Sequence, residues 1–436
     1  MNKRLKSPIN VQIEVTGECT SECIHCYNFW REKGGCSPQS IQSGILCEEN
    51  MLTVLKKLSE AEVFNVSITG GEPLLNFSTT LAGIKFARSK GMGIALNSNL
   101  VLLTKKKAED LKQAGLEHVL TSILGPTEEI HDSVTQRNGS FTKLIEGIKA
   151  AHESGIRVSA NMVVSQINHK YVTKTAQVVA ELGIKNFMAT KAGCPGNCSD
   201  FSHLQLSQTQ LVKFLNDLCW VHENLGLCVD SLEPIPFCGL HGVTHPKLFT
   251  SRRCNAGVMT ATISYDGSVR PCPHLDMSYG NLLTEDFSPI WARMDPWSQG
   301  VQVPNECSGC DMLNICGSGC RMEAKTSTGK INGLDSSTSL SHVAEMTKII
   351  AKPSERVLVK RFKTPKFKLR KEVFGGVFVS GKRNVFIDDR GFAVLSQMKS
   401  ETTYDLATMI IDWNGLDPEK FVSGLAYRQA VSSMLD

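Results

Sequence analysis

The sequence predicts an α/β protein whose core is an open, curved sheet of six parallel strand–helix units. Short apolar runs alternate with amphipathic stretches through residues 1–200, and their period of about 25–30 residues is typical of βαβ units. Glycines follow the amphipathic stretches, as expected at helix ends, where glycine adopts a positive φ at little cost. Six units are too few to close an eight-stranded barrel, so an open sheet is expected.

Six strands and the helices between them account for this pattern. The expected strands are 11–15, 64–69, 93–97, 118–124, 157–164 and 186–190. The expected helices are 51–59, 80–89, 105–115, 141–154 and 171–182. Ligands of parallel α/β folds bind at the carboxyl ends of the strands. The residues that follow these strands are therefore the first candidates for a functional site.

Changes in composition divide the chain into four segments. They are an α/β core over 1–200, a bridging segment over 201–250, a cysteine-rich domain over 251–345 and a small domain over 354–436. The bridging segment contains one expected helix near 207–223. Residues 326–341 are rich in Ser, Thr and Gly, which is typical of a flexible connection.

Composition and charge exclude several classes of protein. Of the 436 residues, 41% are hydrophobic and 21% are charged, which excludes a largely disordered chain. No apolar run reaches the roughly 18 residues of a membrane span, and no apolar signal segment follows the start, so a cytoplasmic protein without a membrane partner is expected. The net charge of +4 is too small to indicate nucleic acid. The 16 cysteines fall below the density of disulfide scaffolds and favour metal or redox chemistry.

Three cysteines follow the first expected strand, at Cys19, Cys23 and Cys26. Three thiolates at this spacing suit three irons of a [4Fe–4S] cluster and leave the fourth iron open. A zinc site that lacks one ligand, or three reduced thiols without a metal, would show the same residues. The second strand ends in Thr-Gly-Gly-Glu-Pro, where paired glycines allow close approach of the backbone and Glu72 can accept from an ammonium group.

Together the CxxxCxxC and GGEP motifs resemble the radical S-adenosylmethionine (SAM) superfamily, which implies a partial (β/α)6 barrel. The resemblance implies that the three cysteines hold a [4Fe–4S] cluster and that SAM binds its open iron through amino and carboxylate groups. It further implies that the methionine amino group lies at the motif formed by Gly70, Gly71, Glu72 and Pro73, with Tyr27 near the adenine.

Weaker matches extend this resemblance to later strand ends. The positions that would face SAM are Asn97, Ser98, Asn99, Ser122, Arg137 and Asn161. Arg137 is the candidate for the SAM carboxylate, because a guanidinium fork suits that partner. Leu124 stands where related sequences often carry aspartate, which puts a ribose contact there in doubt. His131 fits either a SAM-site role or a capping or surface role, and Asn168 is expected to cap a helix.

A second group of cysteines comprises Cys254, Cys272, Cys307, Cys310, Cys316 and Cys320. Paired cysteines in loops are also the usual signature of structural zinc. Between them, residues 263–267 end in Asp-Gly, which predicts a hairpin with a type I′ turn. The whole string resembles the SPASM domain of radical SAM enzymes, which implies two auxiliary iron–sulfur clusters.

The resemblance divides these cysteines into two ligand sets. Cys307, Cys310 and Cys316 would hold one cluster, and no cysteine follows Cys320 to complete it. Asp335 is a candidate for the missing ligand; water, a substrate group or an upstream thiol such as Cys198 are the alternatives. Cys254, Cys272 and Cys320 would hold the other cluster, with Cys238 as the expected fourth ligand.

The C-terminal segment predicts a small winged helix-turn-helix fold. Strands are expected at 374–379 and 384–388, and helices are expected to begin near 391, 402 and 417. The pattern resembles the PqqD-like recognition element of ribosomal-peptide maturases, which implies that a leader peptide adds as a strand to the sheet edge. Val385, Phe386 and Ile387 would line that groove, or belong to the ordinary core.

Charge leaves two questions about this segment open. The stretch 352–371 carries nine lysines and arginines and one acid, which suits either attraction of an acidic leader or a solvated linker. DNA binding through a winged helix is the competing function, but residues 402–417 contain no lysine or arginine. We therefore expect no nucleic-acid partner.

The predicted function is that of a radical SAM/SPASM maturase that cross-links side chains of a ribosomally made precursor peptide, in a cyclophane-like carbon–carbon or ether bond. Thioether formation and Cα epimerisation are alternatives on the same scaffold. A sulfatase-type maturase of folded proteins and an iron–sulfur or zinc DNA-binding regulator are alternatives of other classes. A reductant such as flavodoxin or ferredoxin is the expected electron donor.

Overall fold

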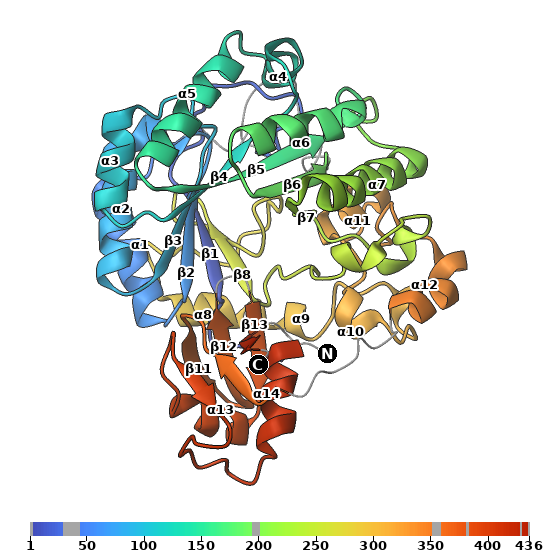
Figure 1. Ribbon diagram of the computed structural model, residues 1–436. Helices are drawn as coiled ribbons and strands as arrows, with labels where there is room; N and C mark the ends of the chain where they lie inside the picture. The colour runs from blue at the N-terminus through green and yellow to red at the C-terminus, as the bar shows by residue number, and fades with distance from the viewer. Residues whose placement is uncertain are drawn as a thin grey trace. The chain divides into compact units, whose positions relative to one another are not determined.

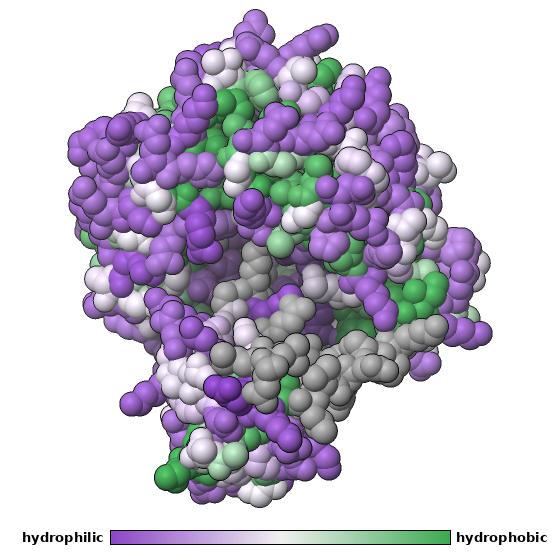
Figure 2. Space-filling model, viewed as in Figure 1, coloured by the Kyte–Doolittle hydropathy of each residue, from purple (hydrophilic) through white to green (hydrophobic). Residues whose placement is uncertain are grey.

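The computed structural model describes residues 3–28, 44–193, 201–350, 359–380, 383–427 and 430–434 (Figure 1). The chain divides into two compact units, Met1–Ile350 and Ala351–Asp436, which are described separately. Every helix of the described ranges is too short or too polar to cross a bilayer. Hydrophilic side chains dominate the face of the molecule shown in Figure 2.

A nine-stranded sheet forms the centre of the first unit, in the order β7-β6-β5-β4-β3-β2-β1-β8-β9. Its first six strands are β1 (Asn10–Glu14), β2 (Asn65–Thr69), β3 (Gly93–Asn97), β4 (His118–Ser122), β5 (Arg157–Val164) and β6 (Asn186–Lys191). All six pair in parallel and in sequence order, which confirms the predicted α/β core. Buried β-branched and aliphatic residues such as Val11 and Ile13 form the core of the sheet.

Helices return the chain between these strands and cover the outer face of the curved sheet (Figure 1). They are α1 (Glu48–Glu60), α2 (Phe77–Ser89), α3 (Lys105–Gln113), α4 (Glu128–Thr135), α5 (Ser140–Glu153), α6 (Val172–Glu181) and α7 (Gln208–Leu225). The predicted glycines do end helices in the left-handed region, as Gly155 does at φ +72°.

The sheet continues beyond the six predicted strands. β7 (Cys228–Asp230) pairs with β6, and β8 (Thr260–Ile263) pairs in parallel with β1. β8 then turns back into β9 (Val269–Arg270) as an antiparallel hairpin. The cysteine-rich segment therefore contributes directly to the central sheet. The sequence did not predict this pairing, because nothing local in 260–263 indicates its distant partner.

The predicted hairpin is present, but its turn differs from the expected type I′. Ser264 and Ser268 bond across a three-residue loop, and only Gly267 takes positive φ, at +86°. The Asp266 carboxylate accepts from the Ser268 N–H at 2.9 Å. This local bond favours a right-handed conformation at Asp266, as in three-residue hairpin loops that place glycine last.

Short helices and loops complete the first unit. They include α8 (Phe287–Ala292), α9 (Asp295–Ser298), α10 (Leu313–Cys316), α11 (Arg321–Thr328) and α12 (Val343–Ile350). Arg321 is buried and donates to the carbonyls of Gln302 and Gly333 at 3.1 and 2.9 Å. Asp335 and Ser337 are also buried, so the flexible connection predicted for 326–341 is wrong. The Asp335 and Ser337 side chains bond within the fold, whereas Lys330 and Asn332 are exposed.

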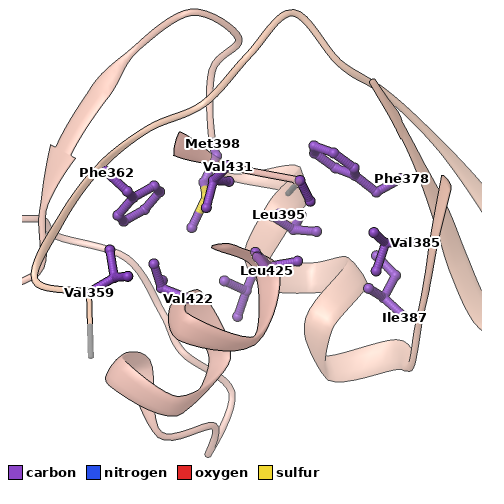
Figure 3. Packing of buried hydrophobic residues seen from close by; sticks show 12 residues of the cluster. Val359, Phe362, Phe378, Val385, Ile387, Leu395, Met398, Val422, Leu425 and Val431 are labelled. Atoms are coloured by element: carbon purple, nitrogen blue, oxygen red, sulfur yellow. The ribbon is translucent and has the colours of Figure 1, made fainter. Parts of the chain in front are cut away.

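The second unit contains two small antiparallel sheets and two helices. One sheet orders β11 (Lys368–Glu372), β12 (Gly375–Ser380) and β13 (Arg383–Ile387); the other orders β14 (Thr403–Asp405), β10 (Arg361–Lys363) and β15 (Ser432–Met434). The helices are α13 (Asp389–Ser396) and α14 (Pro418–Tyr427). Figure 3 shows the core between them, where Phe362, Phe378, Leu395 and Val422 converge.

The expected helix near residue 402 is a strand, so the three-helix prediction is wrong for the described part of this unit. Thr403–Asp405 pairs with β10, and the Tyr404 ring stacks on Phe362 with centroids 5.5 Å apart. Before this strand, the Thr402 N–H donates to the Thr364 hydroxyl at 3.0 Å and the Thr402 carbonyl accepts from the Thr364 N–H at 2.9 Å. Val385 and Ile387 belong to the core, while Phe386 is half-buried.

Candidate functional site

The Cys19–Cys26 loop and the GGEP loop lie side by side at the carboxyl end of the sheet. The parallel pairing of β1 and β2 continues past both strands, since the Gly71 N–H donates to the Thr16 carbonyl at 2.6 Å. The Glu72 N–H likewise donates to the Glu18 carbonyl at 2.7 Å. Two motifs that are about 50 residues apart in sequence are thus joined by backbone hydrogen bonds.

The two glycines are required by this close approach. A Cβ on Gly71 would lie 1.8 Å from the Glu18 carbonyl oxygen. Gly70 has φ +137°, and its Cβ would lie 2.6 Å from the Thr16 carbonyl oxygen. The absence of a Cβ at Gly70 and Gly71 therefore allows the GGEP loop to approach the cysteine loop closely. Pro73 begins the short 3₁₀ helix Pro73–Asn76, which ends the motif.

Glu72 connects the ends of β2 and β3. Its side chain is fully buried, and one carboxylate oxygen accepts from the Leu74 N–H at 2.9 Å and the Ser98 hydroxyl at 2.7 Å. The other oxygen accepts from the Asn99 N–H at 2.8 Å. Burial raises the pKa of Glu72, and these hydrogen bonds oppose the shift by stabilising the charged form.

Asn99 connects this carboxylate to the cysteine loop. Its amide donates to the Thr20 hydroxyl at 2.9 Å and lies 3.7 Å from the Cys19 sulfur. The structure thus brings together Cys19, Glu72, Ser98 and Asn99, all of which the sequence nominated.

The remaining nominated strand ends lie further along the same edge. Asn97 ends β3 and Ser122 ends β4, both half-buried. Ser122 is the register partner of Asn161 on β5, and the Asn161 side chain accepts from the Thr190 hydroxyl at 2.9 Å. Thr121, one residue before Ser122, is buried, and its hydroxyl finds no hydrogen-bond partner within the described residues.

Tyr27 and its neighbours link the first cysteine loop to the cysteine-rich segment. The Tyr27 ring stacks on His274, with centroids 4.4 Å apart and planes 19° apart. Asn28 donates to the Gly70 carbonyl at 3.0 Å. In the described structure, Asn28 Oδ1 and His25 Nδ1 are buried polar atoms without a partner. Sequence reasoning did not single out His25, Asn28 or His274; the adjacency of the first two to Cys26 was the available signal.

His131 and Asp132 bond to other parts of the fold, whereas Arg137 lies at the surface. His131 is buried and accepts from the Leu124 N–H at 3.2 Å, which excludes the surface role and ties α4 to the end of β4. Asp132 accepts from the Ser140 hydroxyl at 2.7 Å and the Phe141 N–H at 2.9 Å, so it caps α5. The Arg137 side chain is exposed.

Asn168 also differs from its expected role as a helix cap. Its side chain donates to the carbonyls of Leu124 and Val163, both at 2.9 Å, and accepts from the Ser165 N–H at 2.8 Å. It makes no side-chain capping bond to the helical turn that it precedes. Asn168 therefore braces the loops after β4 and β5.

We expect acid to destabilise the first unit through His131. Burial lowers its pKa to about 4, whereas the ring titrates near 6.5 in an unfolded chain. Between these values the unfolded chain binds the extra proton, so the free energy of unfolding should fall as the pH decreases from 6.5 towards 4. The ring contributes up to about 1.4 kcal/mol per pH unit.

Apparent unfolding temperatures from pH 7 to pH 5 test this expectation. His131→Gln should lose less stability than the wild type over that range, while His245→Gln, at an exposed histidine, should behave like the wild type. Equal pH dependence of the wild type and His131→Gln would contradict the assignment.

A buried ion pair lies next to the Tyr27–His274 stack. Glu14 on β1 and Arg270 on β9 form a salt bridge, with 0% and 3% of their side chains exposed. Arg270 also donates to the carbonyls of Pro273 and Leu275 at 3.0 and 2.9 Å. Burial raises the pKa of Glu14 to about 7, and Arg270 opposes that shift. The pair joins the core of the sheet to the loop that carries Cys272.

One group of thiols in the cysteine-rich segment contains Cys238, Cys307, Cys310 and Cys316. Burial, together with the neighbouring Cys316 and Cys238, raises the pKa of Cys307 to about 11. The Cys316 sulfur accepts from the Phe237 N–H at 3.3 Å, which places the Cys238 turn beside it. The sequence placed Cys238 with Cys254, Cys272 and Cys320, whereas in the structure the turn that carries Cys238 lies beside Cys316.

The second group contains Cys254, Cys272 and Cys320. Burial raises the pKa of Cys272 to about 12, with Cys254 among its neighbours, and Cys254 also acts on Cys320. Asp335 accepts from the Cys320 N–H at 2.8 Å. The sequence offered Asp335 as a ligand beside Cys307, Cys310 and Cys316, whereas in the structure its side chain lies beside Cys320. Cys198, the other alternative, lies outside the described residues.

Lys191, at the end of β6, lies over this second group. Its Nζ is 3.5 Å from Asp335, 3.6 Å from Glu323 and 3.9 Å from Glu233. Burial alone would lower the pKa of Lys191, but the three carboxylates outweigh it and raise the pKa. Glu233 also bonds to the Cys320 thiol. The barrel and the cysteine-rich segment thus share a buried charged network that sequence reasoning missed.

The donors present fit iron–sulfur clusters. Each group contains thiols whose pKa is raised by burial, Cys307 and Cys316 in one and Cys272 and Cys320 in the other. Bound irons would supply the positive charge that stabilises such thiolates. Across the described ranges, no three His, Cys, Asp or Glu side chains are arranged to hold a single metal ion. A cubane is larger than one ion, so its ligands stand further apart than those of a zinc site.

Two sequence-family models match the chain. The Radical SAM superfamily matches residues 13–179, and the SPASM iron-sulfur cluster-binding domain matches residues 254–311. This chain is a radical SAM enzyme. The first match spans the sheet from β1 to α6 with both motifs of the first site. The second spans the β8–β9 hairpin with Cys254, Cys272, Cys307 and Cys310, while Cys238, Cys316 and Cys320 lie outside it.

Known relatives of this radical SAM enzyme differ in activity. The AdoMet-dependent heme synthase of Oleidesulfovibrio alaskensis is 25% identical over 72% of this chain and 83% of its own length. The subtilosin biosynthesis protein AlbA of Bacillus subtilis is 25% identical over 73% of this chain and 68% of its own. Streptococcus suis SuiB bound to S-adenosylmethionine superposes with a TM-score of 0.61, at 15% identity, over 77% of this chain and 78% of SuiB.

Proposed function

We propose that this radical SAM enzyme modifies a ribosomally made precursor peptide by cross-linking its side chains. In this proposal Cys19, Cys23 and Cys26 hold the [4Fe–4S] cluster on whose open iron SAM binds. When reduced, the cluster and SAM supply a 5′-deoxyadenosyl radical that takes a hydrogen atom from the substrate. The observation that carries the proposal is the joining of the cysteine loop to the GGEP loop by backbone hydrogen bonds.

The same edge of the sheet offers polar atoms for SAM. Glu72 is held rigidly by Ser98 and Asn99, so its carboxylate is positioned in advance for the methionine ammonium. Asn28 Oδ1, one of the buried polar atoms without a partner in the described chain, would pair with a polar ligand. Tyr27, Asn97, Ser122, Arg137 and Asn161 remain candidates at its periphery.

Two auxiliary clusters complete the proposed machinery. One would rest on Cys307, Cys310 and Cys316, the other on Cys254, Cys272 and Cys320. They would accept the electron that remains after the substrate radical forms its new bond. The Tyr27–His274 stack, which joins the first cysteine loop to the loop after Cys272, supports close coupling between the first cluster and the second set.

The peptide substrate is supported by relatives and by the second unit. AlbA is named for bacteriocin biosynthesis, and SuiB has been crystallised with its precursor peptide SuiA. In the second unit β13 forms an edge of its sheet, where a leader peptide would add as a further strand. Cross-linking is the preferred outcome, with thioether formation and epimerisation as alternatives.

The experiment is anaerobic reconstitution with iron and sulfide, followed by reduction with dithionite or flavodoxin and addition of SAM. We expect 5′-deoxyadenosine from the wild type and from Cys228→Ala, at an exposed thiol on β7, and none from Cys23→Ala. Equal yields of 5′-deoxyadenosine from the wild type and Cys23→Ala would overturn the proposal that this cluster cleaves SAM. A precursor peptide that loses two hydrogens indicates a cross-link or thioether. A mass that is unchanged in H2O, with uptake of deuterium at Cα when the reaction is run in D2O, indicates epimerisation.

Haem synthesis is the second candidate, because the heme synthase relatives match a similar share of the chain. Haem formation by the reconstituted protein, together with no change in any precursor peptide, would favour it over peptide modification. The C-terminal unit, in which β13 forms an edge of its sheet, supports the peptide as substrate.

A further inference from the structure

A short turn upstream of the cysteine-rich segment lies against the Cys307 group. The 3₁₀ turn Phe237–Leu240 carries Cys238 and packs against α12. The Phe237 N–H donates to the Cys316 sulfur at 3.3 Å, between residues that are 79 positions apart. The turn is thus anchored on one of the thiols to which the cluster proposal assigns iron.

The position of this turn is fixed from two further sides. A Cβ at Gly239 would lie 2.1 Å from the Ser337 carbonyl oxygen, so the turn fits closely against the loop that follows α11. The Gly239 carbonyl accepts from the Gln208 side chain at 3.0 Å, at the start of α7. Cys238 therefore cannot move towards the other group without breaking these contacts.

Cys238 directly follows Phe237, whose N–H bonds to the Cys316 sulfur, so its thiol lies near Cys307, Cys310 and Cys316. It interacts electrostatically with Cys310, Cys307 and Cys316, and the Ser339 N–H bonds to it. Cys254, in contrast, interacts electrostatically with Cys272 and Cys320. The buried guanidinium of Arg321 acts on Cys307 and would offset part of the charge of four thiolates.

We propose that Cys238 is the fourth ligand of the auxiliary cluster held by Cys307, Cys310 and Cys316. An upstream thiol would thus replace the cysteine that this chain lacks after Cys320, and the cluster would be fully ligated by thiolates. The cluster on Cys254, Cys272 and Cys320 would keep one iron without a thiolate. This inference rests on the proposed function, since it requires that the auxiliary clusters exist.

The test compares the same substitution in two backgrounds of the full-length protein. The first background carries Cys254→Ala, Cys272→Ala and Cys320→Ala; the second carries Cys307→Ala, Cys310→Ala and Cys316→Ala. Each should retain about 8 irons per chain, the first cluster and one auxiliary cluster. Iron content and the EPR spectrum of the reduced protein are measured before and after adding Cys238→Ala.

We expect Cys238→Ala to change or remove the auxiliary EPR signal in the first background, with iron falling towards about 4 per chain if the cluster is lost. It should leave the second background unchanged, and Cys219→Ala, at a buried thiol of α7 outside both groups, should be silent in both. An effect confined to the second background, or none in either, would overturn the inference.

The proposed function fails in a different way. A wild type that holds only about 4 irons would overturn the auxiliary clusters, and this inference with them. Retained 5′-deoxyadenosine formation in the Cys238→Ala protein would show that the first cluster and the barrel are intact, so that a spectral change reports on the auxiliary ligand.

Discussion

Alanine in place of Gly71 is expected to abolish SAM cleavage and to remove the iron held by Cys19, Cys23 and Cys26. The new Cβ would lie 1.8 Å from the Glu18 carbonyl oxygen, far inside contact distance. The obstacle is backbone, so no side chain can rotate away to relieve it. The cysteine loop would have to leave the GGEP loop, which breaks the hydrogen bonds to Thr16 and Glu18.

Iron analysis and 5′-deoxyadenosine formation measure this effect. About 4 irons per chain should be lost while the auxiliary clusters remain, since their ligands are elsewhere. The control is Gly183→Ala, where φ is +76° and nothing lies within 4 Å. That variant should lose only about 1–2 kcal/mol from the left-handed backbone and keep its iron. A Gly71→Ala protein with the iron content and 5′-deoxyadenosine yield of the wild type would contradict the close contact between Gly71 and the Glu18 carbonyl.

Replacing Arg270 with leucine is expected to destabilise the first unit by about 3–5 kcal/mol, because it leaves the Glu14 carboxylate buried without its cation. The carbonyls of Pro273 and Leu275 lose their donor at the same time. The apparent unfolding temperature should fall by on the order of 10 °C in a thermal melt.

Two further variants separate the buried charge from a general effect of losing an arginine. Arg293→Leu breaks an exposed pair with Glu285 in the same segment, together with a hydrogen bond to the Tyr279 carbonyl, and should destabilise the unit far less than Arg270→Leu. The double variant Glu14→Leu with Arg270→Leu removes both charges and should recover at least half of the loss. A double variant as unstable as Arg270→Leu would show that the carbonyl contacts, and not the ion pair, dominate.

The parts that sequence predicted well depend on local patterns. The six strands β1–β6 have short apolar runs, and the first site consists of contiguous motifs at the ends of adjacent parallel strands. Parallel pairing then brought Cys19, Glu72, Ser98 and Asn99 together without further information. The turn after β8 and the strand β14 differ from the predictions because each depends on a single hydrogen bond. The Asp266 carboxylate accepts from the Ser268 N–H in the turn, and the Thr402 N–H donates to the Thr364 hydroxyl before β14.

The parts that sequence could not predict depend on long-range placement. Cys238 and Asp335 exchanged groups: each lies beside the thiols that the other was expected to join. No spacing rule distinguishes these arrangements, since Cys238 precedes both groups and Asp335 follows both. The Phe237–Cys316 and Asp335–Cys320 hydrogen bonds decide them only in the folded chain. The same holds for Lys191, whose carboxylate partners come from three separate segments.

The pairing of β8 with β1 has a consequence for how the protein can be divided. A fragment that stops at residue 250 would leave β1 as an edge strand, with a row of unsatisfied backbone N–H and C=O groups next to the first cluster. Such an edge is a template for association with other chains. We expect that fragment to aggregate, whereas a fragment that continues through α12 to residue 350 should stay monodisperse, even though both contain the whole match to the Radical SAM superfamily.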